Sequence, residues 1–143
     1  MPLLIAAIAF LVAPPFAEPQ WYRVNSGKQT IAYVEGLGIA KDGDLRTTSM
    51  ATIRSAASMD GSLMFVTKLT FNCATGEVSE HKVTYLDEQG NVLRSGDPIA
   101  GTAFHSIFEG TNIDFARRFV CAGEGGTRVD DPVADSRIAF GMQ

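Results

Sequence analysis

The stretch LMFVTKLTFNC, residues 63–73, alternates between two kinds of side chain. One parity of the stretch is apolar or cysteine at nearly every position: Leu63, Phe65, Leu69, Phe71 and Cys73. Residues of one parity point to the same face of a β-sheet, because successive side chains of a strand point to opposite faces. The pattern therefore predicts a half-buried strand whose apolar face directs Cys73 toward the core.

Further strands are predicted on both sides of this one, separated by turns rich in Gly, Asn and Asp. They are WYRV (21–24), TIAYVE (30–35), DLRTTSMATI (44–53), SEHKVTYLD (79–87) and VLRS (92–95). DEQGN, residues 87–91, is predicted as the hairpin turn that joins the last two. Short strands joined by tight turns predict an antiparallel sheet.

One helix is predicted over residues 111–121, TNIDFARRFVC. Thr111 is suited to the N-cap and Asp114 to the third helical position, where a carboxylate complements the helix dipole. Ile113, Phe115, Ala116, Phe119 and Val120 share a broad apolar face. Cys121 falls on the opposite side of the wheel, so we expect the helix to fray or end near Arg118 or Phe119 and Cys121 to turn back toward the sheet, before a chain reversal at Gly123.

The first seventeen residues carry no charge, and their apolar run from Leu3 to Val12 is too short to span a bilayer. Pro14 and Pro15 break this segment, and the small residues Ala13 and Ala17 are candidate cleavage positions before Glu18. Residues 1–17 are therefore predicted to be a signal peptide, with a buried N-terminal helix as the alternative. We expect a mature chain that starts near Glu18, lacks a transmembrane span, and is periplasmic or secreted.

Export bears on the two cysteines, Cys73 and Cys121. In an oxidising compartment, two cysteines that are far apart in sequence favour a structural disulfide. The short C-x-x-C spacing typical of metal and redox sites is absent from the sequence. We therefore predict a disulfide that joins the helix end to the sheet, with two unrelated buried thiols as the alternative.

Together these elements predict an α+β domain, an antiparallel sheet with one C-terminal helix packed on it. A chain of 143 residues fits a single domain, which we place at residues 18–124. Residues 125–143 are rich in glycine and then acidic, and they are predicted to form a flexible C-terminal tail. SRIAFGM, residues 136–142, offers the alternative of a short strand or a docked segment.

Composition and motifs exclude several functions. The net charge of −4, without a run of Lys or Arg, argues against binding to nucleic acid. Gly36 and Gly38 form a G-x-G, but a turn and a strand pattern follow them, so a dinucleotide site is not predicted. His81 and His105 are the only histidines and have no nucleophile or ligand motif beside them, so we predict no catalytic residue, no metal site and no cofactor.

Four aromatic residues, Trp21, Tyr22, Phe104 and Phe108, stand apart from the other motifs, and some of them could line a groove or patch for a partner. Trp21, Tyr22 and Phe104 are the three that the core needs least. Packing in the core is the alternative role for each of them.

The order of several motifs resembles the surface-adhesin protein E family of small secreted bacterial proteins. The motifs are Trp21, AYVE (32–35), FNC (71–73), TYLDEQGNV (84–92) and FHSIFEGTNIDFARRFVCAG (104–123). The most specific part is a skeleton of Cys73, Tyr85, Asp87, Gly90 and Cys121. The resemblance covers about residues 21–123 and implies an envelope-associated adhesin that binds host extracellular-matrix proteins, built on an antiparallel sheet with a packed helix. The chain differs in lacking a lipobox cysteine.

We therefore expect an exported, non-enzymatic binding protein of the bacterial envelope that recognises a protein partner in the envelope or the extracellular matrix. Two alternatives remain, a periplasmic binder of a small ligand and an enzyme whose polar residues converge only in the folded chain. A deep pocket that joins His81 or His105 to a carboxylate would favour the enzyme, whereas an apolar patch would favour the binding protein.

Overall fold

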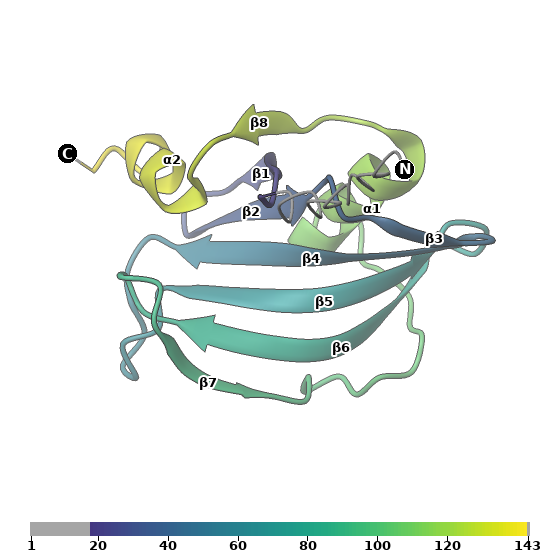
Figure 1. The fold of residues 1–143 in the computed structure, drawn as a ribbon, viewed down its shortest axis with the longest axis horizontal. Coiled ribbons are helices and arrows are strands. Elements are labelled where there is room, and N and C mark those ends of the chain that lie inside the picture. Colours follow the sequence, from purple (N-terminus) through teal and green to yellow (C-terminus); the bar gives the residue numbers. More distant parts are fainter. Residues whose placement is uncertain (1–17, 143) are drawn as a thin grey trace, which may run out of the picture.

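The computed structural model describes residues 18–142, which form one antiparallel sheet and two helices (Figure 1). The elements are β1 (Trp21–Ser26), β2 (Thr30–Glu35), β3 (Ala40–Asp42), β4 (Leu45–Arg54), β5 (Met64–Asn72), β6 (Glu77–Leu86), β7 (Val92–Gly96), α1 (Asn112–Ala122), β8 (Thr127–Val129) and α2 (Pro132–Ala139). The strand order is β7-β6-β5-β4-β2-β1-β8, with β3 paired to β4. The predicted signal peptide, residues 1–17, lies outside the described residues.

The predicted strands and the hairpin turn at residues 87–91 are confirmed. In this turn the Asp87 carboxylate accepts hydrogen bonds from the backbone N–H groups of Gln89 and Asn91, at 3.0 and 2.8 Å. Gly90 has a φ of +84°, a conformation that glycine adopts without a steric penalty. This local chemistry reverses the chain between β6 and β7 and fixes their antiparallel pairing.

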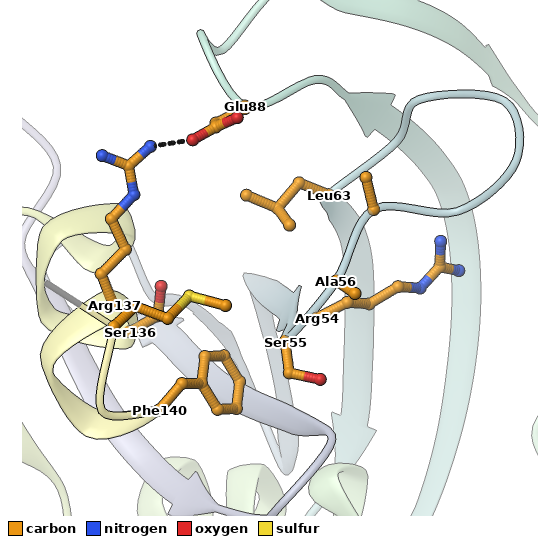
Figure 2. A pocket seen from close by; sticks show the side chains of 10 residues that line it. Arg54, Ser55, Ala56, Leu63, Glu88, Ser136, Arg137 and Phe140 are labelled. Atoms are coloured by element: carbon orange, nitrogen blue, oxygen red, sulfur yellow. Dashed lines mark hydrogen bonds and ion pairs between the residues drawn. The ribbon is translucent and has the colours of Figure 1, made fainter.

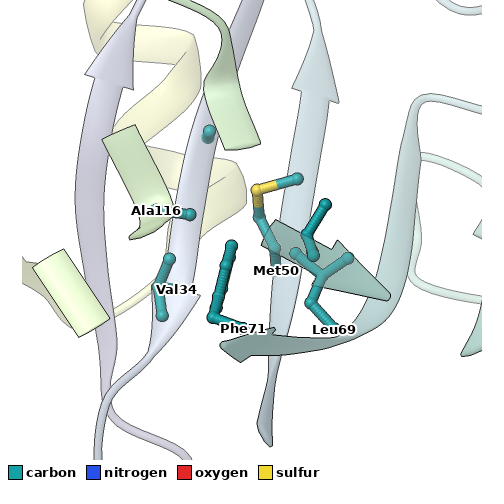
Figure 3. Close-up of a cluster of buried hydrophobic side chains, with 7 residues drawn as sticks. Val34, Met50, Leu69, Phe71 and Ala116 are labelled. Carbon is teal, nitrogen blue, oxygen red and sulfur yellow. The ribbon is translucent and has the colours of Figure 1, made fainter. Parts of the chain in front are cut away.

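Each face of the sheet carries its own apolar cluster, because alternate side chains of β2 and β4 point to opposite faces. The first cluster, which we call the α1 cluster, contains Ala32, Val34, Met50, Leu69, Phe71, Val78 and Ala116 (Figure 3). The second, the α2 cluster, contains Ile31, Tyr33, Ala51 and Ile53, against which Val133 and Phe140 pack. Burying each large aliphatic or aromatic side chain contributes about 1.5–3 kcal/mol, so both faces stabilise the domain.

The parity predicted for residues 63–73 holds within the strand but not before it. Leu69, Phe71 and Cys73 pack in or against the α1 cluster, as predicted. Leu63 instead packs against the α2 cluster, because it precedes β5. Its carbonyl accepts from the N–H of Arg54, and its own N–H donates to the carbonyl of Leu86.

Helix α1 begins as predicted but does not end where the sequence suggested. The Thr111 hydroxyl accepts from the Asp114 N–H at 3.3 Å, and Gly123 closes the helix in the left-handed conformation. The prediction that the helix frays or ends near Arg118 or Phe119 is wrong, since it continues through Cys121 to Ala122. Asp114 shares a flank with Cys121 and is buried, so the packed part of α1 is wider than its apolar stripe.

The disulfide between Cys73 and Cys121 is present, and it links the end of β5 to the last turn of α1. The two Cα atoms lie 5.5 Å apart, within the usual range for a disulfide. The fold is therefore an antiparallel sheet with a helix bonded covalently to it, and the cysteine lies on a packed flank of the helix rather than beyond its end.

The prediction of a flexible tail over residues 125–143 is wrong for its described part. β8 pairs with β1, where Val129 lies opposite Trp21. Asp131 then caps α2 by accepting from the N–H groups of Val133 and Ala134, and Pro132 occupies the first turn, where its missing N–H has no cost. Tertiary pairing orders this segment, although it has no sustained periodicity of its own.

Among residues 18–142, neither α1 nor α2 is long and apolar enough to cross a bilayer, and these residues form no other α-helix.

Candidate functional site

The β7 edge of the sheet is interrupted where the chain leaves β7 and returns before α1. β7 pairs with β6 as far as Gly96, which lies opposite Val83. The chain rejoins the same edge at His105, which forms an isolated antiparallel bridge with Val78. Residues 97–104 therefore stand opposite only residues 79–82 and must fold out of the sheet. We call residues 97–104 the edge loop.

The edge loop is held at both ends and in its middle. The backbone N–H groups of His105 and Val78 each donate to the other residue's carbonyl, at 2.9 and 3.0 Å. The Ser79 hydroxyl donates to the Thr102 carbonyl at 2.5 Å. Pro98 is buried, whereas its neighbour Ile99 is fully exposed. The loop thus presents an apolar side chain to solvent from an anchored backbone.

A groove of about 320 Å³ separates the edge loop from strands β5 and β6. Its sheet side consists of Phe65, Thr67, Glu80, Val83 and Tyr85, and its loop side of Pro98, Ile99 and Ala100. The strand register brings the floor together, since Phe65 lies opposite Tyr85 and Thr67 opposite Val83. The two aromatic rings have centroids 6.0 Å apart, a separation typical of interacting aromatic pairs. We call this hollow the edge groove.

Two arginines flank the aromatic end of the floor. The Arg94 guanidinium lies 3.6 Å from the centroid of the Tyr85 ring and forms an ion pair with Asp60 at 3.0 Å. The Arg54 guanidinium lies 5.2 Å from the centroid of the Phe65 ring. Hydrogen bonds donated by the Ser62 hydroxyl and N–H, and then by Arg94, hold the pKa of Asp60 well below its usual range. Asp60 is therefore ionised and keeps the Arg94 guanidinium in an ion pair.

Glu80 lies among the other groove residues and contacts the imidazole of His105. The His105 Nε2 atom lies 3.2 Å from a carboxylate oxygen of Glu80, and its Nδ1 atom lies 3.0 Å from the carbonyl oxygen of Ser106. The Glu80 side chain is 18% exposed and that of His105 is 37% exposed. Both ring nitrogens therefore face acceptors.

A second apolar hollow, of about 150 Å³, adjoins His105 on the side of α1. Val78, Ile107, Phe108 and Ile113 are its apolar lining residues. Phe108 is 83% exposed, so most of this large apolar side chain is not packed against the rest of the protein. His105 lines this hollow and contacts Glu80 in the edge groove, so the two hollows meet at the His105–Glu80 contact.

The structure does not bring the three predicted partner-binding residues together. Phe104 lies in the edge loop and is 43% exposed. Trp21 and Tyr22 lie in β1, near the opposite edge of the sheet. Trp21 packs against the α2 cluster, and the Tyr22 ring lies 5.1 Å from that of Phe119.

The Tyr22 ring also explains why residue 36 is a glycine, because a Cβ atom at that position would approach the ring to 2.6 Å. Ile99 was not predicted as a partner-binding residue, and Phe108 belonged to the predicted aromatic group but not to the three candidates chosen from it. A signal for Ile99 was present in the sequence, because an isolated large apolar residue stands there in the loop motif SGDPIAG, residues 95–101.

His81 lies away from both hollows. Its Nε2 atom lies 2.7 Å from the hydroxyl oxygen of Thr70, which in turn lies 2.8 Å from that of Thr47. These side chains form a polar network across β4, β5 and β6. The network satisfies the buried Thr70 hydroxyl, a structural role.

A third hollow, of about 160 Å³, lies between α2 and the segment that follows β4 (Figure 2). Leu63, Ala56 and Phe140 supply much of its apolar lining. An ion pair between Arg137 and Glu88 spans one side, as the dashed line in Figure 2 shows. The hollow is comparable in size to cavities that bind a molecule as small as benzene.

Neither a metal site nor a relative identifies the chain further. Residues 18–142 contain no group of three or more His, Cys, Asp or Glu side chains that could hold a metal ion. No protein-family model, no curated protein and no solved structure matches this chain.

Proposed function

We propose that the chain is an exported, non-enzymatic binding protein of the bacterial envelope, adhesin-like, which recognises a protein partner through the edge loop and the two hollows beside it. The observation that carries this proposal is the exposure of Ile99 and Phe108, two large apolar side chains that adjoin apolar hollows. Exposed apolar side chains that cluster around grooves are typical of protein-interaction surfaces. Phe104 lies in the same chain segment and adds a third aromatic or aliphatic contact.

The anchoring of the edge loop supports this role. Its ends and its middle are fixed by the bridge at Val78 and the Ser79 hydrogen bond, so Ile99 is displayed from a backbone with restricted freedom. A pre-ordered loop loses less conformational entropy on binding than a free one. The disulfide between Cys73 and Cys121 supports export, because such bonds persist in oxidising compartments.

The surroundings of His105 support binding rather than catalysis. A general base needs a free ring nitrogen within reach of the proton that it removes. Both nitrogens of His105 face the acceptors Glu80 and Ser106, and neither has a hydroxyl partner among the described residues. The pair lies where two shallow apolar hollows meet, which suits recognition of a surface.

The test compares alanine variants at exposed apolar positions by surface plasmon resonance on immobilised laminin and fibronectin. Ile99→Ala, Phe104→Ala and Phe108→Ala should weaken binding, the strongest of them by about tenfold or more, since a few apolar anchors dominate most interfaces. Met59→Ala and Ile138→Ala are matched controls, because these exposed side chains lie outside both hollows. Equal effects of the control and edge-loop variants would contradict the proposal, as would the absence of binding to either matrix protein.

The hollow beneath α2 favours a second candidate function, the binding of a small apolar ligand. Its size and its Leu63 and Phe140 walls suit one aromatic ring. Titration with indole, followed by ¹H–¹⁵N NMR, should shift the amide resonances of Leu63 and Phe140 in a saturable way. Enlarging Ala56 to Leu should abolish the shifts, and indole that leaves both amides unshifted would exclude this candidate.

A further inference from the structure

Glu80 is the only charged residue among those that line the edge groove. Its side chain is four-fifths buried, with Leu69 opposite it on β5 and Val83 beside it in the groove. A carboxylate removed from water among apolar groups is costly unless a cation or several donors compensate it. His105 is the partner that the structure places against it.

His105 cannot serve both of its acceptors when it is neutral. A neutral imidazole carries a single N–H, whereas the Ser106 carbonyl faces Nδ1 at 3.0 Å and the Glu80 carboxylate faces Nε2 at 3.2 Å. If the proton is on Nδ1, the Nε2 lone pair points at a carboxylate oxygen. When His105 keeps its N–H for Ser106, the Glu80 carboxylate has no donor from the imidazole, and a cation supplied from the groove would compensate its charge.

We propose that the edge groove receives a lysine side chain of the partner protein, with its ammonium group at Glu80. This inference rests on the proposed function and specifies the chemistry of the partner. The aliphatic stem of a lysine would lie along Val83 and the Phe65–Tyr85 pair, in the way that long basic side chains cover apolar surface while their charge reaches a polar group.

Lysine fits better than arginine because only part of the carboxylate is free. One oxygen of Glu80 already faces His105, so the bidentate geometry that arginine prefers is not available. An ammonium group is compact and can donate to a single oxygen. An acidic occupant is disfavoured, since Arg94 at the other end of the floor is already paired with Asp60.

The test uses n-pentylammonium chloride as a lysine side-chain probe, with n-pentanol and sodium pentanoate as matched controls, in ¹H–¹⁵N NMR titrations of the whole protein. The ammonium should shift the amides of Thr67, Val83 and Tyr85 and saturate at concentrations about tenfold lower than pentanol, because a hydrogen bond between charged groups is stronger than a neutral one. Pentanoate should bind most weakly.

Glu80→Gln keeps the shape of the side chain and should reduce ammonium binding to the level of pentanol. Glu109→Gln is the control, because Glu109 is acidic, close in sequence to the site and 91% exposed. His105→Ala should retain ammonium binding, since it removes the competing group. Should Glu80→Gln fail to fold, as its NMR spectrum would show, Glu80→Asp draws the carboxylate back by one methylene and should weaken the ammonium more than the alcohol.

Equal affinity for ammonium and alcohol, or unchanged ammonium binding in the Glu80 variants, would overturn the lysine proposal and indicate a purely apolar occupant. The matrix-protein test with Ile99→Ala and Phe108→Ala is independent of that result. If the groove does not select ammonium but Ile99→Ala and Phe108→Ala weaken binding to the matrix proteins, the proposed function stays intact. If these two variants leave matrix binding unchanged, the function itself is refuted.

Discussion

Removing the disulfide by the double substitution Cys73→Ala and Cys121→Ala should lower the free energy of unfolding by about 4 kcal/mol. The cysteines are 48 positions apart, and in the chain-entropy model a closed loop of that length removes about 14 cal/mol/K from the unfolded chain, or about 4 kcal/mol at 25 °C. Typical domains have about 5–15 kcal/mol in total, so the loss is a large share. Most of the effect should appear as a lower urea midpoint.

Urea unfolding followed by circular dichroism measures this change, in the presence and absence of a reducing agent. Reduction should shift the oxidised wild-type protein by about as much as the double substitution does, and it should leave the double variant unchanged. A loss of less than about 1 kcal/mol would refute the reasoning, since it would mean that the unfolded chain gains little freedom when the bond is absent.

Three further predictions concern the packing of the β1 edge and α2. Burial, and then a 2.8 Å hydrogen bond to Asp135, raise the pKa of Tyr33 above that of an unfolded tyrosine. The protonated side chain therefore contributes its full share of the free energy of unfolding below the unfolded-state pKa. That contribution should decline above about pH 10. Tyr33→Phe should abolish that decline in pH-dependent unfolding. Trp21→Ala should lower the free energy of unfolding in urea by about 2 kcal/mol, because the indole packs on the α2 cluster. Phe104→Ala should change it by no more than about 0.5 kcal/mol, because Phe104 is exposed. A larger loss for Phe104→Ala than for Trp21→Ala would contradict the assignment of Trp21 to packing and Phe104 to the surface. Asp131→Ala removes the N-cap of α2 and should cost about 1 kcal/mol, whereas an unchanged calorimetric Tm would mean that the cap contributes nothing.

Local patterns were sufficient to predict most of the sheet. Period-2 alternation around Phe71, together with the side-chain chemistry of the turn at Asp87, depends on near neighbours in the sequence. Thr111 and Gly123 likewise act within one turn of α1. Such features can be predicted from a sequence because the interactions that form them span only a few residues.

The elements that the sequence did not predict depend on distant partners. β8 has three residues and is ordered by pairing with β1, and α2 is held through Asp135, which binds both Arg23 and Tyr33. The sequence DDPV, residues 130–133, contains a cap and a first-turn proline, but that signal was outweighed by the surrounding glycines and acidic residues.

The edge groove could not be predicted for the same reason. Its floor exists because the register places Phe65 opposite Tyr85, and its wall exists because the edge loop is excluded from the sheet between Gly96 and His105. Neither relation is visible in local periodicity. The contact between Glu80 and His105 joins residues 25 positions apart, which a motif search does not find.

The pairing of the first strand with the last sets the order in which the molecule can be completed as it emerges from the ribosome. Trp21 lies opposite Val129, and Val133 and Phe140 complete the cover over the apolar side chains of β2 that face α2. Until residues near 140 have been released, the α2 side of the nascent sheet is incompletely covered and the outer edge of β1 is unpaired. A chaperone that shields β1 and β2 during that interval would act on the segment that waits longest for its partner.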